Sequence, residues 1–241
     1  MQKLLLRNSY VTFQNRRDSV SKISLAVDFI LFTIEDNQLK VLLVKRAEQP
    51  YQEMLALPGV AVKEDETLIH AARRCLKEET GIEENIYMEQ LFTWGDNIHR
   101  DPRNRVVSVS YFALVSRQIL KEHAGQRVLS VNFYDVDWVL GDVVQLAFDH
   151  KEIISYGRER LKNKAQYSTI IFHLMDEEFT LPQLQKVYEI LIGKEVFKAN
   201  FRNQVKDLVE DTGKMIKNGA YRPSKIYKRR NIKDSSINDK L

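Results

Sequence analysis

Apolar positions in the first half of the chain follow strand-like spacing. The runs Ser24–Ile34 and Leu39–Lys45 are apolar and rich in β-forming residues, and four polar residues separate them. This arrangement predicts a hairpin. Three further strand-like runs follow at residues 86–94, 106–115 and 131–139. The first half is therefore expected to form several strands.

Two helices are predicted beside these strands. The segment Glu66–Thr80 has an apolar stripe at helical spacing, formed by Ile69, Ala72 and Leu76. Asp149 and Glu152 form an Asp-x-x-Glu capping pattern, which predicts a helix that runs toward Leu161. Residues 164–178 then follow without enrichment in Gly or Pro, so a fairly rigid connection is expected.

The last quarter of the chain has the order helix, turn, helix and hairpin. Thr180 and Gln183 form a capping box, and apolar residues repeat at helical spacing until Gly193 ends the helix. The core positions of a second helix are Phe201, Val205 and Leu208. Residues 217–220 then predict a tight turn between strand-like runs at 212–216 and 222–227. This order is typical of a winged helix.

Charge divides the chain in the same place. The full sequence has 241 residues and a net charge of +4. Residues 181–241 carry 14 basic and 7 acidic side chains, whereas the first 180 residues carry 23 basic and 26 acidic side chains. A basic last part suggests a polyanionic partner, although a solvated surface with a basic tail would give the same balance.

The second helix of the last part has a polar flank suited to DNA. Arg and Asn side chains make the forked hydrogen bonds that distinguish base edges, and Lys neutralises phosphate. The candidates are Arg202, Asn203 and Lys206 on this flank, with Arg222 and Lys225 on the wing. The alternative is a small helical docking domain whose basic face is only solvated.

Residues 57–82 read LPGVAVKEDETLIHAARRCLKEETGI and resemble the Nudix box, a loop-helix-loop that binds divalent metal and a nucleotide diphosphate. The matching positions are Glu66, Arg74, Leu76, Glu78, Glu79, Gly81 and Ile82. Val60 stands where the family has Gly, and Cys75 stands where it has the Glu that follows Arg74. The resemblance implies the αβα sandwich of the Nudix fold.

The substitution at Cys75 bears on catalysis. In Nudix hydrolases Mg²⁺ neutralises the diphosphate and lowers the pKa of the attacking water, and Mg²⁺ prefers oxygen ligands. Carboxylates at positions 75, 78 and 79 would share one flank of the helix, so only Glu78 and Glu79 remain there, with Glu66 as the third metal-ligand candidate. The thiol is expected to be neutral and inert. We therefore expect no catalytic residue, and Mg²⁺ is the cofactor that a residual site would bind.

An arginine-rich stretch leads into the strand that begins at Val106. Arg100, Arg103 and Arg105 fall within six residues, beside Asp101. Paired guanidinium donors suit a diphosphate or sugar hydroxyls, and Arg46 at the end of the second strand is a further candidate. Alternatively, some of these arginines pair with Asp96 or Asp101 to fix the loop. The expected effector-binding residues are Arg46, Arg100, Asp101, Arg103 and Arg105.

As a whole the chain resembles the Nudix-related transcriptional regulators from residue 24 to residue 228. The resemblance rests on the altered box, on residues 100–111, and on residues 179–181, 200–202, 222–223 and 227. It implies an α+β fold class and adds Asn200 and Tyr227 to the DNA-binding candidates. The expected divisions are an N-terminal extension at 1–22, a Nudix-like effector-binding domain at 23–163, a junction at 164–178, a winged helix-turn-helix domain at 179–230 and a polar tail at 231–241.

The same resemblance implies a function. Family members are homodimers that bind palindromic operator DNA, and their Nudix domain senses ADP-ribose, a related nucleotide sugar or a simple sugar without cleaving it. DNA binding would require no cofactor. The single cysteine, with no leader and no apolar run long enough for a membrane, favours the cytoplasm. Two alternatives stay open: an Mg²⁺-dependent Nudix hydrolase acting on ADP-ribose or a related compound, and a docking module on an inactive enzyme.

Overall fold

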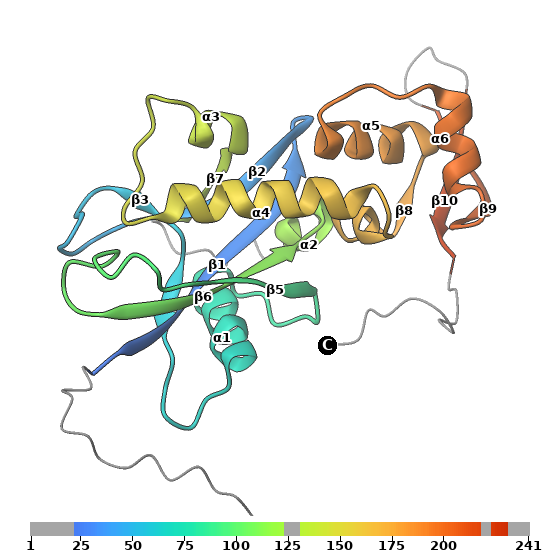
Figure 1. The fold of residues 1–241 in the computed structure, drawn as a ribbon. Helices are drawn as coiled ribbons and strands as arrows, with labels where there is room; N and C mark the ends of the chain where they lie inside the picture. The colour runs from blue at the N-terminus through green and yellow to red at the C-terminus, as the bar shows by residue number, and fades with distance from the viewer. Residues whose placement is uncertain (1–21, 123–130, 218–222, 231–241) are drawn as a thin grey trace, which may run out of the picture.

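The computed structural model describes residues 22–122, 131–217 and 223–230. Its first part is a seven-stranded sheet with helices on both faces (Figure 1). The strands are β1 (Ser24–Glu35), β2 (Gln38–Lys45), β3 (Leu55–Ala56), β4 (Gly59–Ala61), β5 (Tyr87–Trp94), β6 (Val106–Leu114) and β7 (Val131–Asp135). The helices are α1 (Leu68–Thr80), α2 (Arg117–Glu122), α3 (Val136–Leu140) and α4 (His150–Ala165).

The sheet has the order β3-β2-β1-β6-β5, with β4 paired to β1 and β7 paired to β2. The predicted hairpin is confirmed, because β1 and β2 are antiparallel and Glu35 lies opposite Gln38. The central pair β1 and β6 is parallel over nine residues, from Ser24 opposite Val106 to Phe32 opposite Leu114. The chain therefore brings the starts of these two strands to one edge of the sheet.

The central strand β1 is buried on both faces. Val27, Phe29 and Leu31 contribute to a core beneath α1, and Ile30 and Phe32 contribute to a second core beneath α4. Alternate side chains of a strand point to opposite faces, so this apolar run requires a layer on each side. The expected αβα sandwich is confirmed.

Two local expectations are wrong. The run at 131–139 is a strand only as far as Asp135, because the Asp135 carboxylate accepts a hydrogen bond from the Trp138 N–H and caps α3. Helix α4 does begin after Asp149, yet the Asp149 side chain makes no capping hydrogen bond. Its carboxylate instead accepts hydrogen bonds from Arg100 at 2.7 and 2.6 Å.

The last part of the chain forms the predicted winged helix. It consists of β8 (Glu178–Phe179), α5 (Leu181–Ile192), α6 (Lys198–Val205), β9 (Val209–Ile216) and β10 (Ser224–Arg229). The capping box of Thr180 and Gln183 is confirmed, and Gly193 ends α5 with a left-handed φ of 73°. Strands β8, β10 and β9 form a small sheet. The predicted turn at 217–220 and Arg222 lie outside the described residues, apart from residue 217.

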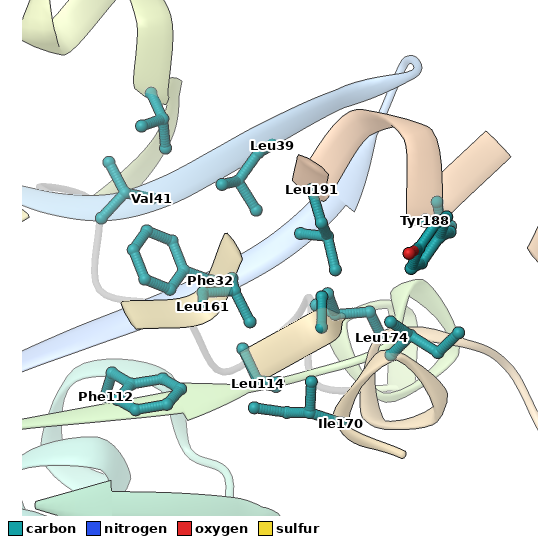
Figure 2. Close-up of a cluster of buried hydrophobic side chains, with 14 of the residues drawn as sticks. Phe32, Leu39, Val41, Phe112, Leu114, Leu161, Ile170, Leu174, Tyr188 and Leu191 are labelled. Atoms are coloured by element: carbon teal, nitrogen blue, oxygen red, sulfur yellow. The ribbon is translucent and has the colours of Figure 1, made fainter. Parts of the chain in front are cut away.

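A shared hydrophobic core joins the two parts. Between α4 and α5, the 3₁₀ helix η2 (Ile170–Leu174) buries four of its five residues. Figure 2 shows Phe32, Leu39 and Leu114 of the large sheet facing Leu174 and Leu191 of the later segments. The connection at 164–178 is therefore packed against the core. Within the residues that the structure describes, no helix is long and apolar enough to cross a membrane.

Candidate functional site

A pocket of about 400 Å³ opens where β1 begins, beside the start of α4. Its lining includes four of the five expected effector-binding residues: Arg46, Arg100, Asp101 and Arg103. Asp28, Phe148 and His150, which the sequence did not single out, also line it. The structure thus gathers residues from β1, the end of β2, the loop before β6 and the start of α4.

Arg100 joins two carboxylates beside this pocket. Its Nη2 lies 2.9 Å from Asp28 Oδ2 and 2.6 Å from Asp149 Oδ1, and only 7% of the residue is exposed. Burial opposes the charge of Arg100, but the hydrogen bonds and charges of the two aspartates outweigh it and raise the pKa. Because its Nε and Nη2 donate to these carboxylates, Arg100 positions Asp28 and Asp149 in the pocket.

A glycine makes room for this ion pair. A Cβ at Gly59 would lie 2.9 Å from Asp28 Oδ1 and 3.1 Å from the Val27 carbonyl oxygen. Gly59 pairs with Asp28 across β4 and β1. The glycine of the Leu57-Pro58-Gly59 segment therefore allows the Asp28 carboxylate to lie against the strand and face Arg100.

His150 is the first residue of α4 and is almost fully buried. Its Nδ1 accepts a hydrogen bond of 2.8 Å from the Leu57 N–H, so the ring is neutral with its proton on Nε2. Burial lowers the pKa of His150 below its ordinary value, although Asp28 and Asp149 act in the opposite direction. The ring links the start of α4 to the segment that leads into the Nudix box.

Arg46 and Arg103 approach the same aromatic ring. The Arg46 and Arg103 guanidinium carbons lie 4.8 and 5.6 Å from the centroid of Phe148. The pKa of Arg46 is lowered by burial and by the positive charge of Arg103. Asp101 neutralises Arg103 in part through hydrogen bonds of 3.0 and 2.7 Å. Two cations on one aromatic platform form a site that an anion would stabilise.

The remaining arginine of the stretch lies elsewhere. Arg105 is outside the pocket lining, and its Nη2 donates a hydrogen bond of 2.9 Å to the Gly95 carbonyl oxygen. The pairing of Arg103 with Asp101 confirms the alternative that at least one arginine fixes the loop.

Phe148 of the pocket has a backbone φ of 55°, which is strained for a non-glycine residue and which no sequence pattern reveals.

The Nudix-box carboxylates do not line this pocket. Both Glu66 oxygens accept hydrogen bonds from Arg74, at 2.8 and 2.9 Å, and these bonds lower the pKa of Glu66 to about 2. Glu78 lies 3.5 Å from Arg74 Nη1. Glu79 is half-buried, and burial together with the charge of Glu78 raises its pKa. Arg74 thus pairs with two of the three proposed metal ligands, Glu66 and Glu78.

Cys75 is fully buried in the core beneath α1, together with Ala71 and Ala72. Burial, with the nearby charges of Glu79 and Asp28, raises the pKa of the Cys75 thiol and keeps it neutral. The donor set of this box is therefore a neutral thiol, two arginine-bound carboxylates and one further carboxylate. This set does not fit Mg²⁺, which requires several oxygen ligands.

A second group of metal-ligand types lies in the pocket itself. One ligand atom from each of Asp28, Asp149 and His150 falls within 4.8 Å of the others. The Arg100 guanidinium already provides the positive charge between the two carboxylates, and His150 Nδ1 accepts the Leu57 N–H. These residues form a protein ion-pair cluster and do not fit a metal ion.

Helix α6 presents the predicted polar flank. Phe201 and Val205 are buried, and the Phe201 ring packs 5.5 Å from that of Tyr188 on α5. This anchoring leaves the other side of the helix in solvent. The exposed candidates on it are Asn200, Arg202, Asn203 and Lys206, the last of which follows the final helical residue.

The wing candidates differ in exposure. Lys225 is exposed and lies 2.7 Å from Asp211 Oδ2 across β9 and β10. Tyr227 is half-buried and packs against the shared core, opposite Phe179 of β8. Packing therefore explains part of the role of Tyr227, whereas Lys225 is exposed at the surface, where it can contact DNA.

Comparisons with known proteins place both parts in one family. Residues 24–156 match the NUDIX domain, and residues 171–228 match the NrtR DNA-binding winged helix domain. The ADPR responsive transcriptional repressor NtrR of Acinetobacter baylyi is 34% identical over 85% of this chain and 81% of its own length. This chain belongs to the NrtR family of Nudix transcriptional regulators.

Solved structures agree with this assignment. The chain is similar to Shewanella oneidensis NrtR complexed with a 27mer DNA, with 40% identity, a TM-score of 0.77, and coverage of 86% of this chain and 93% of that one. The Nudix domain of the same NrtR complexed with ADP ribose is 37% identical, with a TM-score of 0.50, over 61% of this chain and 94% of that one. The NrtR family thus accounts for the order of the two parts, with a DNA-binding winged helix at the end.

Proposed function

We propose that this NrtR-family regulator binds ADP-ribose, or a closely related nucleoside-diphosphate sugar, in the pocket beside Phe148 and does not hydrolyse it. The observation that carries the proposal is the convergence of Arg46 and Arg103 on one aromatic ring in a pocket of about 400 Å³. ADP-ribose is the first ligand to consider because the A. baylyi relative is described as ADPR responsive and the S. oneidensis domain was solved with ADP ribose.

The pocket binds charge without a metal in this proposal. A diphosphate between Arg46 and Arg103 would relieve the repulsion that lowers the pKa of Arg46. Arg100 pairs with both Asp28 and Asp149 and offsets one of their two negative charges, which weakens their repulsion of the ligand. Phe148 supplies an apolar face for the ribose or the base.

Helix α4 connects this pocket to the DNA-binding part. Its first turn carries His150 at the pocket, and the helix packs against α5 farther along the chain (Figure 1). Lys151 fixes the same end by donating hydrogen bonds to the Gly141 and Val144 carbonyl oxygens. A ligand that changes the Arg100–Asp149 contact would therefore act on α4, which also packs against α5 of the winged helix.

The same proposal includes the finer roles of the DNA-binding part. Two copies of the chain would present two α6 helices to a palindromic operator, since the two-fold axis of a dimer matches that of the site. Asn200, Arg202 and Asn203 would contact bases, while Lys206, Arg222, Lys225 and Tyr227 would contact the backbone or minor groove. DNA binding needs no cofactor, and the regulator would act in the cytoplasm, where it meets chromosomal DNA.

The test is calorimetric titration of the full chain with ADP-ribose, without added metal. We expect binding in the wild type and at least tenfold weaker binding in Arg46→Ala and Arg103→Ala, because each removes a charged hydrogen bond. Arg117→Ala removes an exposed arginine of α2 outside the pocket and serves as the matched control. Gel shifts with genomic fragments should change when ADP-ribose is added. No binding, or equal loss in the control, contradicts the pocket assignment.

The hydrolase alternative is tested by a separate activity assay. The carboxylates of Glu78 and Glu79 remain in the box, so wild type and Cys75→Glu are incubated with ADP-ribose and Mg²⁺, and AMP and ribose phosphate are measured. We expect no turnover by the wild type, since its donor set does not fit Mg²⁺. Turnover by the wild type would overturn the non-catalytic assignment, whereas turnover only by Cys75→Glu would show that position 75 alone removed the activity.

A further inference from the structure

Phe197 is an exposed aromatic residue at the start of the second helix of the winged helix. It is the N-cap of α6, and 82% of its surface is exposed. Lys198, Arg202 and Asn203 of the same helix are exposed as well. A large apolar side chain thus lies at a polar, basic end of a DNA-binding domain, and either helix stability or contact with a partner would be a reason for it.

Helix stability does not supply that reason. Phe197 makes no side-chain capping hydrogen bond, in contrast to Thr180 at the N-cap of α5 and Thr67 at the N-cap of α1. Phenylalanine cannot accept such a bond, and Ser, Thr, Asp or Asn would stabilise the position. The apolar contact that often precedes a helix is available from Val196, which packs against the core that contains Phe201.

The position of Phe197 fits a contact with bases. In helix-turn-helix proteins the N-terminal residues of the second helix reach the base edges in the major groove. Phe201 and Val205 are buried and anchor α6, Phe201 against Tyr188 of α5, whereas Phe197 at the N-cap is exposed. A phenyl ring forms no conventional hydrogen bond with a base edge. The apolar feature of the major groove is the C5-methyl group of thymine.

We propose that Phe197 is a specificity-determining residue that recognises thymine in the operator by packing against its C5-methyl group. This inference rests on the proposed DNA binding by α6 and goes beyond it, because none of the polar candidates on the helix reads a methyl group in this way. Phe197 would add sequence preference without contributing to the attraction of phosphate.

The experiment uses full-length protein and a fragment selected from genomic DNA by the wild type. Each thymine of the fragment is replaced in turn by deoxyuridine, which lacks only the C5-methyl group. The Kd is measured by fluorescence anisotropy for the wild type, Phe197→Ala and Phe197→Leu. Tyr167→Ala is the matched control, since Tyr167 is a 72% exposed aromatic residue outside the winged-helix elements. Thermal melts check that each variant keeps its fold.

For the wild type we expect deoxyuridine at one or a few thymines to weaken binding about fourfold, the equivalent of ~0.8 kcal/mol for a buried methyl-sized group. Phe197→Ala should weaken binding to the thymine fragment by about the same factor and lose the response to deoxyuridine at those positions. Phe197→Leu should retain part of the response to deoxyuridine, because leucine keeps an apolar side chain at this position. The dependence of Kd on salt should not change, because no phosphate contact is removed.

Two results would overturn the inference while leaving DNA binding intact: wild type that is indifferent to deoxyuridine at every thymine, or Phe197→Ala that keeps the full response. A Tyr167→Ala variant with the same loss as Phe197→Ala would also overturn it, since the effect would not belong to α6. If the wild type selects no fragment at all, the proposed function fails together with this inference, and that outcome is distinct from the other three.

Discussion

At the scale of single residues, His150 should make stability depend on pH. Its folded pKa is depressed because the ring is buried and Nδ1 accepts the Leu57 N–H. The unfolded chain therefore binds a proton more readily, and the stability contributed by the neutral ring is present above the unfolded pKa, about 6.5, and is lost as pH falls toward the folded pKa.

We therefore expect the free energy of unfolding, measured with urea, to fall by about 1 kcal/mol or more between pH 7 and pH 5. In His150→Asn this fall should be smaller, since the amide oxygen can accept the Leu57 N–H but does not titrate. His99→Asn, at an exposed histidine, should behave as the wild type does. An unchanged pH response in His150→Asn would show that the fall arises from other groups.

At the scale of elements, Glu89 ties the far end of α4 to the sheet. This buried carboxylate of β5 accepts hydrogen bonds from Arg160 at 3.1 and 2.8 Å and also pairs with Lys164 and Tyr87. Burial would raise the pKa of Glu89, but these donors outweigh it and lower the pKa. One carboxylate thus joins two turns of α4 to the strand beneath them.

Glu89→Gln should lower the free energy of unfolding by about 2 kcal/mol at pH 7, since charged hydrogen bonds are weakened at a buried position. The deficit should shrink as pH falls through the depressed folded pKa, because the wild type then loses the same charge. Urea denaturation at pH 7 and at a pH below the folded pKa of Glu89 measures this deficit. The exposed Glu64→Gln variant is the control. A stability equal to that of the wild type at pH 7 would mean that packing alone holds α4.

At the scale of the whole molecule, the proposed palindromic operator would require two-fold symmetry of the protein. A palindromic site requires two copies of α6 related by a two-fold axis. We expect light scattering at DNA-binding concentrations to give a mass of about twice the 28.2 kDa of one chain. The protected DNA should contain two half-sites about one helical turn, or a multiple of it, apart. A single-chain mass with a single half-site would contradict the dimer.

Local interactions made much of this protein predictable from its sequence. The hairpin of β1 and β2 follows from apolar runs around a polar turn, and the capping box of Thr180 and Gln183 requires only neighbours four positions apart or fewer. Cys75 revealed an altered Nudix box because the spacing of that motif lies within one helix and its flanks. The clustering of arginines at 100–105 likewise indicated one segment of the pocket lining, through Arg100, Asp101 and Arg103.

Tertiary structure decided what depended on contacts between distant segments. The Asp149 carboxylate could have capped α4, but Arg100, 49 residues away, takes both of its oxygens. Asp28 and His150 joined the site only because β1 and the start of α4 meet beside Arg100. Phe197 lies four residues before the buried Phe201, so helical spacing alone would place it on the same stripe, yet the structure leaves it exposed at the N-cap of α6. Sequence spacing sets which bonds a segment can make by itself, whereas competition for a charged partner is settled when the whole chain packs.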